Sequence, residues 1–350
     1  TGLAADLRGL GRYDEALEIS GRVLAGYQEL LGDQDSRTLS AQNNLAVTLR
    51  LLGRYEECLE LDRRTLDARR QLLRQRHAWT LYSEINYATD LRLLGRYNEA
   101  FSLQNKSVQE HRRVLGPDNP QTLRAEHNLA LCHYRNGDRS RAADLFTRVL
   151  ERCERALGDS DPLTMMFAAS QSFFAREHGD IDQARAISEK VVQGYVDMLG
   201  EEHPYVAGTR TNHALILRSV GERQQAYHLL EEALDHMGRF VGENHPWTLG
   251  CAINASAVRN LIGDVEAAVA LTDSVVTRAV EVLGRTHPLT LSARIAHAAD
   301  LRGVRDRQRA EKVETEALDD LVATLGVQHV HTVSARSRNR PYWDFEPQMI

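Results

Sequence analysis

Leu52-Gly-Arg-Tyr-Glu-Glu-Cys58 has two close copies in the chain, and their spacing decides the fold. The copies are Leu10-Gly-Arg-Tyr-Asp-Glu-Ala16 and Leu94-Gly-Arg-Tyr-Asn-Glu-Ala100, each 42 residues away. The glycine of this motif returns at the same step at Gly137, Gly179, Gly221 and Gly263, with Arg305 in the eighth copy. Because self-similarity at a fixed period is typical of repeat proteins, we predict an array of one repeated unit.

Two further landmarks keep the 42-residue step. A Leu-Gly or Val-Gly pair recurs from Leu31-Gly32 to Leu325-Gly326, and only Leu73-Arg74 departs from it. A Thr-Leu pair, first at Thr38-Leu39, recurs with a few variants. We predict helix A between Thr-Leu and the turn glycine, and helix B between that glycine and Leu-Gly. Glycine suits both ends because it adopts the left-handed conformation that terminates helices.

The predicted fold is all-α, a right-handed superhelical solenoid of antiparallel helix pairs with about fifteen helices. Residues 1–336 form the array, with a partial first repeat and seven 42-residue periods. The chain starts in mid-repeat without a methionine, so we expect a piece of a longer protein. Residues 337–350 are predicted to form a C-terminal capping tail. Terminal repeats expose an apolar face, so Pro341, Tyr342, Trp343 and Phe345 are expected to fold back over the last helix B.

Composition and motifs exclude several functions. A net charge of −6 without a basic run argues against nucleic acid, and no apolar run is long enough for a membrane span. No phosphate-binding loop, zinc-protease motif or nucleophile elbow occurs, so we expect neither an enzyme nor a cofactor. The four cysteines lack C-x-x-C spacing, which favours reduced core residues and a cytoplasmic protein. The preference for arginine over lysine is typical of an actinobacterial source.

The repeat resembles a known family in Asn43-Asn44-Leu45-Ala46, in Gly53-Arg54-Tyr55-Glu56-Glu57 and in Leu199-Gly200-Glu201-Glu202-His203-Pro204. These motifs are similar to the 42-residue tetratricopeptide repeats of kinesin light chain and nephrocystin-like proteins. The resemblance implies that helix A lines a concave groove and supplies the ligand contacts. It also suggests the C-terminal array of an actinobacterial signalling NTPase, or the tetratricopeptide protein of the FxSxx-COOH peptide-modification system. The ending Asp344-Phe345-Glu346-Pro347 is similar to the ending of such proteins.

Two ladders of polar residues follow one face of helix A at the 42-residue step. The first consists of asparagines: Asn44, Asn86, Asn128, Asn212 and Asn254. Asparagine is a mediocre helix former, so its recurrence in mid-helix needs a reason. Its amide can bond the main chain of an extended peptide, which is the role that the resemblance implies. It can equally bond a neighbouring helix and organise the stack, and the sequence leaves both hypotheses open.

The second ladder consists of arginines: Arg50, Arg92, Arg176 and Arg218, with Arg302 in the same register. Each lies in the last turn of helix A, where a cation also favours the helix dipole, so solvated surface is the simpler interpretation for any one of them. Together they favour a ligand with acidic groups or a free C-terminal carboxylate.

The helix A that contains Met166 and Phe173 is unusually apolar. By register these two side chains lie beside Tyr134 on the groove side. Core packing is the favoured interpretation, and an anchor pocket for an apolar ligand side chain is the functional alternative.

Histidines His77, His203, His245, His287 and His329 share one register. Asp35, Asn119 and Asp161 fill the same position in other copies, and these are helix-capping residue types. We therefore predict helix caps and no metal site.

The sequence as a whole predicts a scaffold that binds a protein or peptide, acting as the sensor or adaptor arm of a larger bacterial protein. Two alternatives remain. The array can present a precursor peptide to a maturation enzyme, or it can serve a structural role through self-association.

Overall fold

A computed structural model describes residues 2–350, and within them the chain forms seventeen α-helices and no strand. The helices are α1 (Gly2–Gly9), α2 (Tyr13–Leu31), α3 (Ser36–Leu51), α4 (Tyr55–Leu73), α5 (Ala78–Leu93), α6 (Tyr97–Leu115), α7 (Pro120–Arg135), α8 (Arg139–Leu157), α9 (Pro162–His178), α10 (Ile181–Leu199), α11 (Pro204–Ser219), α12 (Arg223–Phe240), α13 (Pro246–Ile262), α14 (Val265–Leu283), α15 (Pro288–Gly303), α16 (Arg307–Leu325) and α17 (Val330–Arg336). Odd-numbered helices are the predicted A helices and even-numbered ones the B helices. The predicted all-α repeat solenoid is confirmed, and two more helices form than expected because the partial units at both ends are also helical.

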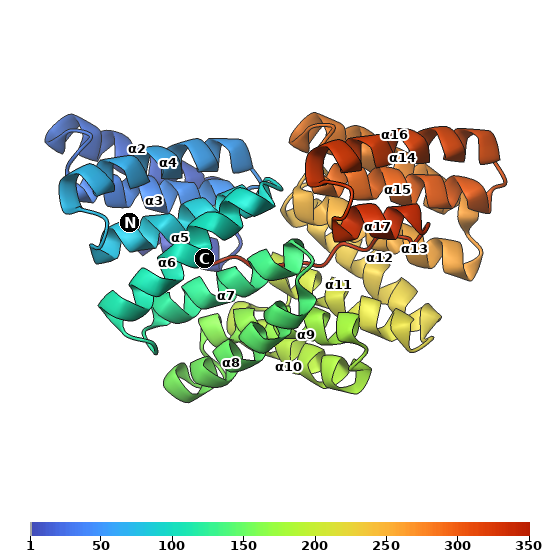
Figure 1. Cartoon of the computed structure of the whole chain (residues 1–350), viewed down its shortest axis with the longest axis horizontal. Helices are drawn as coiled ribbons and strands as arrows, with labels where there is room; N and C mark the ends of the chain where they lie inside the picture. Colours follow the sequence, from blue (N-terminus) through green and yellow to red (C-terminus); the bar gives the residue numbers. More distant parts are fainter. Residues whose placement is uncertain (1) are drawn as a thin grey trace. The chain divides into compact units, whose positions relative to one another are not determined.

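The helices belong to two compact units. The first runs up to Phe167 and includes Gln348–Ile350, and the second runs from Ala168 to Pro347. Within each unit, successive helices are joined by short turns and pack side by side as hairpins (Figure 1). In the second unit the A helices also contact one another, α11 with α13 and α13 with α15.

The two positions where arginine replaces the repeat glycine keep the glycine conformation. Gly53 has φ 72°, and Arg305 takes φ 63° at the matching turn. Arg74, which follows α4, has φ 70° and ψ 163°. That region of backbone conformation is nearly restricted to glycine, so the geometry of the repeat is imposed on these side chains by the packed helices around them.

The predicted histidine caps are confirmed. Nδ1 of His77, His203, His245, His287 and His329 each accepts a hydrogen bond from the backbone N–H two residues later, at 3.1–3.3 Å. Asp35, Asn119 and Asp161 accept the same bond with side-chain oxygens. An accepting Nδ1 places the ring proton on Nε2, so these histidines act as neutral capping groups.

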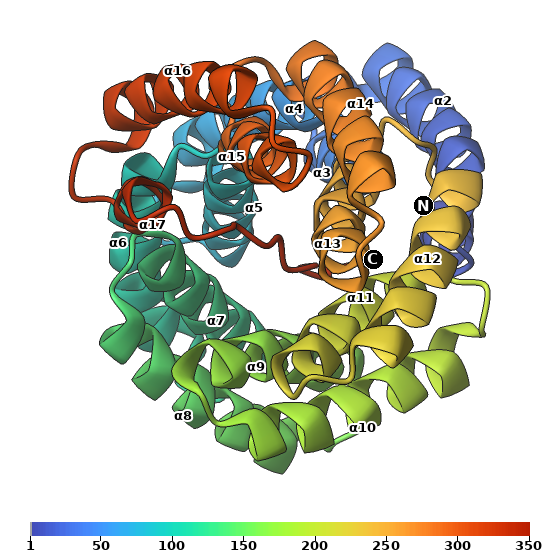
Figure 2. The ribbon, with the colours of Figure 1, turned by 90° about the vertical axis from the view of Figure 1, so that its right-hand side faces the viewer.

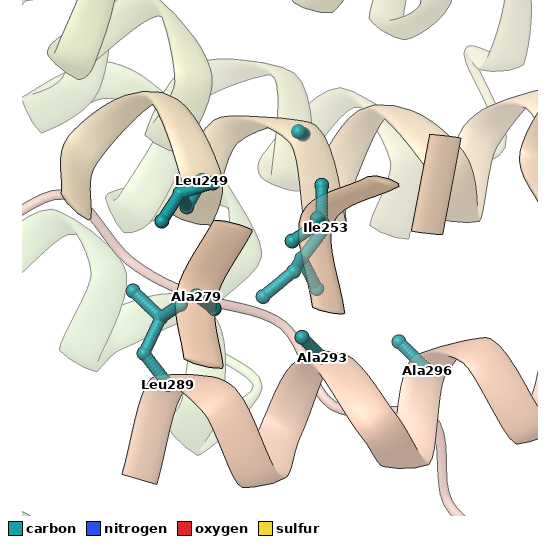
Figure 3. Packing of buried hydrophobic residues seen from close by; sticks show 8 residues of the cluster. Leu249, Ile253, Ala279, Leu289, Ala293 and Ala296 are labelled. Atoms are coloured by element: carbon teal, nitrogen blue, oxygen red, sulfur yellow. The ribbon is translucent and has the colours of Figure 1, made fainter. Parts of the chain in front are cut away.

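Each hairpin buries its apolar side against the next one. In the second unit, Leu249 and Ile253 of α13 point toward Leu289 and Ala293 of α15, with Ala279 of α14 beside them (Figure 3). The alanines that recur in both helices are fully buried, for example Ala268 in α14 and Ala298 in α15. Small side chains at these positions allow the close approach of helices that the stack requires.

Other predictions about composition have a structural counterpart. All four cysteines are buried as thiols, as expected for small core residues. Across residues 2–350, none of the helices combines the length and apolarity needed to span a membrane.

The segment after α17 leaves the helical array as an extended chain and runs toward α13 and α11 (Figure 2). Residues 344–347 are buried there. The expectation that Trp343 and Phe345 fold over the last helix B is wrong, because their main chains pair with Asn254 of α13 and Asn212 of α11, which are A helices.

Candidate functional site

Two asparagines of the ladder form hydrogen bonds with the main chain of the C-terminal segment. From here on, the tail means Arg340–Pro347, the part of the predicted 337–350 segment that contacts the second unit. The backbone N–H of Phe345 donates to Oδ1 of Asn212 at 2.8 Å, and Nδ2 of Asn212 donates to the Phe345 carbonyl at 2.9 Å. Asn254 forms the same pair with Trp343, at 2.9 Å and 2.7 Å. A carboxamide donates and accepts on one edge, so it satisfies both main-chain groups of one residue as a neighbouring strand does.

The spacing of these contacts relates the repeat to an extended chain. Asn212 and Asn254 are one 42-residue repeat apart, and the residues they hold, Phe345 and Trp343, are two apart. Alternate residues of an extended chain present the same edge. One repeat of the array therefore corresponds to two residues of the tail, which runs in the opposite order to the helices.

A glycine lies one helical turn before each of these asparagines. A Cβ added at Gly208 would lie 2.4 Å from the ring of Phe345, and one added at Gly250 would lie 2.6 Å from the ring of Trp343. Both glycines are inside helices, at the fifth residue of α11 and of α13, where glycine costs about 1 kcal/mol relative to alanine. They are explained by the aromatic rings, which rest directly on the helix backbone.

Aromatic side chains complete the site around Phe345. Its ring meets Tyr205 edge-on at 5.5 Å between centroids and Trp247 at 5.2 Å. Tyr205 and Trp247 also contact each other, at 5.6 Å. Phe345 is 5% exposed, so its ring is almost fully withdrawn from water. Edge-to-face arrangements of this kind are favourable beyond the area they bury.

Charged groups bind the polar side chains of the tail. Arg176 of α9 holds the carboxylate of Asp344 with bonds of 2.9 and 3.3 Å, and both side chains are 5% exposed. The guanidinium of Arg218 lies over the ring of Tyr342, 4.0 Å from its centroid. Arg340 donates to Asp300 at 2.8 Å and to Ser256 at 2.7 Å. Two members of the arginine ladder thus contact the tail, one through an acidic residue and one through an aromatic ring.

The sequence is similar to a known family of repeat proteins over part of its length. The tetratricopeptide repeat family model matches residues 1–71 and 76–155. In these N-terminal repeats the chain is similar to the tetratricopeptide repeat family. No curated protein sequence matches it significantly.

Several solved structures are similar to this chain. A Rap protein complexed with competence and sporulation factor is 13% identical with a TM-score of 0.65, over 96% of this chain and 94% of that chain. The Rap conjugation gene regulator of plasmid pLS20, in complex with the Phr* peptide, is 12% identical with a TM-score of 0.55, over 91% and 93%. Repeats of a putative kinesin light chain from Podosopora anserina are 24% identical with a TM-score of 0.45, over 57% and 95%.

The ladder asparagines of the first unit have different partners from those of the second. Asn86 accepts a hydrogen bond from Arg124 at 2.8 Å, and Asn128 donates to Thr89 at 3.1 Å. Both bonds connect neighbouring A helices of the solenoid. Asn44 is half-buried, and its backbone carbonyl accepts a hydrogen bond from the Thr48 hydroxyl. The two hypotheses for the ladder therefore apply to different repeats, with stack-organising bonds at Asn86 and Asn128 and main-chain pairing at Asn212 and Asn254.

Arg50 does not lie on a ligand-binding surface of the solenoid. Its guanidinium is 1% exposed and bonds Asp90 at 2.7 Å and Asp62 at 2.9 Å. Cys58, Asp62 and Asp90 are close enough together to hold a metal ion, but the Arg50 cation already bonds both carboxyl groups. Burial, followed by the nearby Asp90, raises the pKa of the Asp62 carboxyl well above its usual range. The predicted ligand contact at Arg50 is wrong because repeat stacking has enclosed the side chain, and Arg92 is also buried, at 4% exposure.

The apolar residues proposed as an anchor pocket belong to the core of the repeats. Met166 packs in a cluster with Leu123, Val149 and Phe167, and Phe173 is 0% exposed. Tyr134 is half-buried beneath the guanidinium of Arg135. Core packing, the favoured interpretation, is confirmed for Met166 and Phe173.

Sequence reasoning missed the glycines Gly208 and Gly250, the aromatic pair Tyr205 and Trp247, and the tail as an occupant of the A helices. A signal for the glycines was present. Gly-x-x-x-Asn occurs at the ladder position in two adjacent copies, and a mid-helix glycine repeated at the period of the array indicates close approach of another group.

Proposed function

We propose that this chain is a non-enzymatic scaffold that binds an extended peptide on the A-helix face of its second unit, at the surface formed by Gly208, Asn212, Gly250 and Asn254, hereafter the tail site. The observation that supports the proposal most directly is the reciprocal pairing of Asn212 and Asn254 with an extended main chain. Main-chain pairing binds peptides irrespective of sequence, and the surrounding side chains then select among them.

The preferred ligand is acidic. Arg176 binds the Asp344 carboxylate inside a nearly dry contact, where a charge-assisted bond is strong. Two proteins of the same fold, the Rap protein and the pLS20 regulator, are described in complex with competence and sporulation factor and with the Phr* peptide. Their low identity supports the suitability of the fold for such ligands and carries no residue-level argument.

In the cell, the scaffold would act as the sensor or adaptor arm of a larger cytoplasmic protein of bacterial origin. Resemblance of the repeat to the arrays of actinobacterial signalling NTPases supports this role. Affinity capture from the native host, with wild type beside the Asn212→Ala/Asn254→Ala variant, should recover a partner that depends on the two amides. If both proteins recover the partner equally well, the partner does not bind at the tail site.

A displayed library of random peptides tests the binding proposal directly. The target is the full chain carrying Trp343→Ala and Phe345→Ala, which weakens the hold of the tail on its site. Selected peptides should lose at least about tenfold in affinity when Asn212→Ala and Asn254→Ala are added, because two paired amides are removed. Asn128→Ala, whose amide bonds Thr89 in the first unit, is the matched control and should leave affinity unchanged.

Two results would contradict the proposal. The selection could yield no peptides, or the selected peptides could bind with and without the two amides equally well. Circular dichroism and the melting temperature of each variant should accompany the affinities, so that a loss of folding is not taken for a loss of contact.

A further inference from the structure

We propose that the tail is a built-in copy of the ligand, and that the ligand itself is an extended segment with two aromatic residues flanking one acidic residue. An external segment of this kind must displace the tail to bind. The inference rests on the proposed function and names both the ligand class and the competitor.

The tail site is two repeats long, which fixes the spacing of the aromatic residues. Gly-x-x-x-Asn occurs at Gly208–Asn212 and Gly250–Asn254. At the position of the glycine, the other copies carry side chains: Ser40, Tyr82, Arg124, Met166, Ser292 and Ser334. Only these two repeats therefore combine an asparagine that can pair with a peptide main chain and a glycine that lets an aromatic ring contact the helix backbone. Their one-repeat separation requires rings two residues apart, as Trp343 and Phe345 are.

The prolines of the tail fit the ends of this site. Continuing the observed register by one repeat in each direction places Pro341 opposite Ala296 and Pro347 opposite Ser170. Proline has no N–H to donate, and these two ladder positions carry no asparagine to accept one. The prolines of the tail therefore fall at the two ladder positions without asparagine, and the two residues with a paired N–H fall at the positions with one.

The residue between the two rings is selected by charge. Asp344 lies between Trp343 and Phe345, so in an extended chain its side chain points to the face opposite the two rings. Arg176 meets it there at 2.9 Å. A neutral residue at this position would leave the buried guanidinium of Arg176 with the Glu177 carboxylate, at 2.7 Å, and without the second carboxylate that Asp344 supplies, which is unfavourable.

Competition by the tail is strong because it is part of the same chain. A tethered segment acts at an effective concentration in the millimolar range, so it outcompetes a free segment of equal intrinsic affinity at micromolar concentration. The apparent affinity for a free ligand equals its intrinsic affinity multiplied by the fraction of time that the tail leaves the site open.

A labelled synthetic peptide with the sequence of residues 340–350 tests this competition by fluorescence anisotropy. We expect it to bind the full chain carrying Trp343→Ala and Phe345→Ala at least about tenfold more tightly than it binds wild type. Adding Asn212→Ala and Asn254→Ala should abolish the gain. Trp79→Ala, which removes an exposed aromatic residue of the first unit, is the control and should behave as wild type.

Gly208→Ala provides a second variant that does not depend on changing the tail. The new Cβ would fall 2.4 Å from the Phe345 ring, while alanine is the better helix former, so α11 is expected to stay folded. Hydrogen exchange at the amides of Trp343 and Phe345 should accelerate at least about tenfold, and the peptide should not bind in trans. Gly21→Ala in α2, where nothing lies within 4 Å of the added Cβ, is the matched control.

The outcomes separate the inference from the proposed function. Equal peptide affinity for wild type and the Trp343→Ala/Phe345→Ala variant overturns the competition, while peptides from the displayed library can still bind. A peptide in which Asn replaces the Asp344 equivalent should bind at least about tenfold more weakly, and equal binding overturns the acidic requirement. No binding of the tail peptide to any variant overturns the ligand class, and the library screen then decides on peptide binding itself.

Discussion

Arg50 shows how one side chain can hold three parts of a repeat array together. It bonds Asp62 of α4 and Asp90 of α5 from its own position in α3, and Asn43 bonds Asp62 at 2.7 Å. Burial and the nearby Asp90 raise the pKa of the Asp62 carboxyl, and the Arg50 guanidinium acts in the opposite direction. Such a buried cluster is stable only while all of its members are present, because removal of one leaves the others without a partner.

Arg50→Ala should therefore destabilise the first unit by about 3–5 kcal/mol, because it leaves two buried carboxyl groups without the cation that bonds both. Urea denaturation measures this loss. Arg54→Ala, which breaks an exposed pair with Glu57, is the control and should change stability by no more than about 1 kcal/mol. A cost at Arg50 as small as that at Arg54 would show that the buried cluster contributes nothing specific.

Buried histidines predict a loss of stability in mild acid. Burial lowers the pKa of His111 and His297 below the usual 6.5, so the folded state resists protonation. A lowered folded-state pKa contributes stability that is complete above pH 6.5. That contribution is lost as the pH falls from 6.5 toward the folded-state pKa, because only the unfolded state takes up the proton. The expected slope is at most about 1.4 kcal/mol per pH unit for each histidine.

His111→Gln tests this slope at one site. Nδ1 of His111 lies 2.8 Å from the Ser107 carbonyl, and a glutamine amide can donate the same bond. Urea midpoints at pH 7.5 and 5.5 should differ less in this variant than in wild type. His228→Gln, at an exposed histidine, should retain the wild-type difference. An unchanged difference in His111→Gln would contradict the argument.

At the scale of the helical hairpin, the end of α4 stores strain. Arg74 adopts φ 70° and ψ 163°, where a Cβ clashes with the backbone, whereas Gly32 at the equivalent place after α2 has φ 81° and ψ 169° without that penalty. The hairpin retains its geometry because α4 and α5 pack against each other on either side of the turn.

Arg74→Gly should stabilise the protein by about 1–3 kcal/mol, an unusual direction for a change to glycine. Thermal unfolding followed by circular dichroism measures the gain as a raised melting temperature. Arg74→Ala keeps the Cβ and should give little of it, so the pair separates strain from any effect of the arginine head group. A lower melting temperature for Arg74→Gly than for Arg74→Ala would show that the turn is not strained.

At the scale of the whole chain, the tail acts across several repeats of the second unit. It contacts α9 through Asp344, α11 through Phe345 and α13 through Trp343. Repeat arrays are held together mainly by neighbouring units, so a segment that crosses three hairpins adds long-range coupling that the repeats themselves lack.

Removal of residues 341–350 should lower the melting temperature by roughly 5 °C, because buried aromatic surface and four main-chain bonds are lost. Hydrogen exchange should accelerate in α11 and α13 and stay unchanged in α3 and α4. A truncated protein that is monomeric, equally stable and equally protected would contradict a stabilising role for the tail. Faster exchange throughout the chain would instead contradict the local coupling expected of a repeat array.

The repeat sequence by itself determined the helices, their turns and their caps. Each of these features depends on a few neighbouring residues, such as Gly53 at a turn or His287 at the start of a helix. The 42-residue repeat then places the same feature in successive copies. Stacking follows because neither helix of a unit can bury its apolar side alone. The same local reasoning placed the asparagine ladder on one face of the A helices.

Only the tertiary structure decided what each ladder residue does. Asn128 and Asn212 occupy equivalent positions in their repeats, yet one bonds Thr89 in the neighbouring helix and the other bonds Phe345, which lies 133 residues further along the chain. The difference depends on where an extended segment passes, and no periodic pattern encodes that path. Arg50 and Arg176 differ for the same reason, since a charged side chain takes its role from the carboxylates that folding brings beside it.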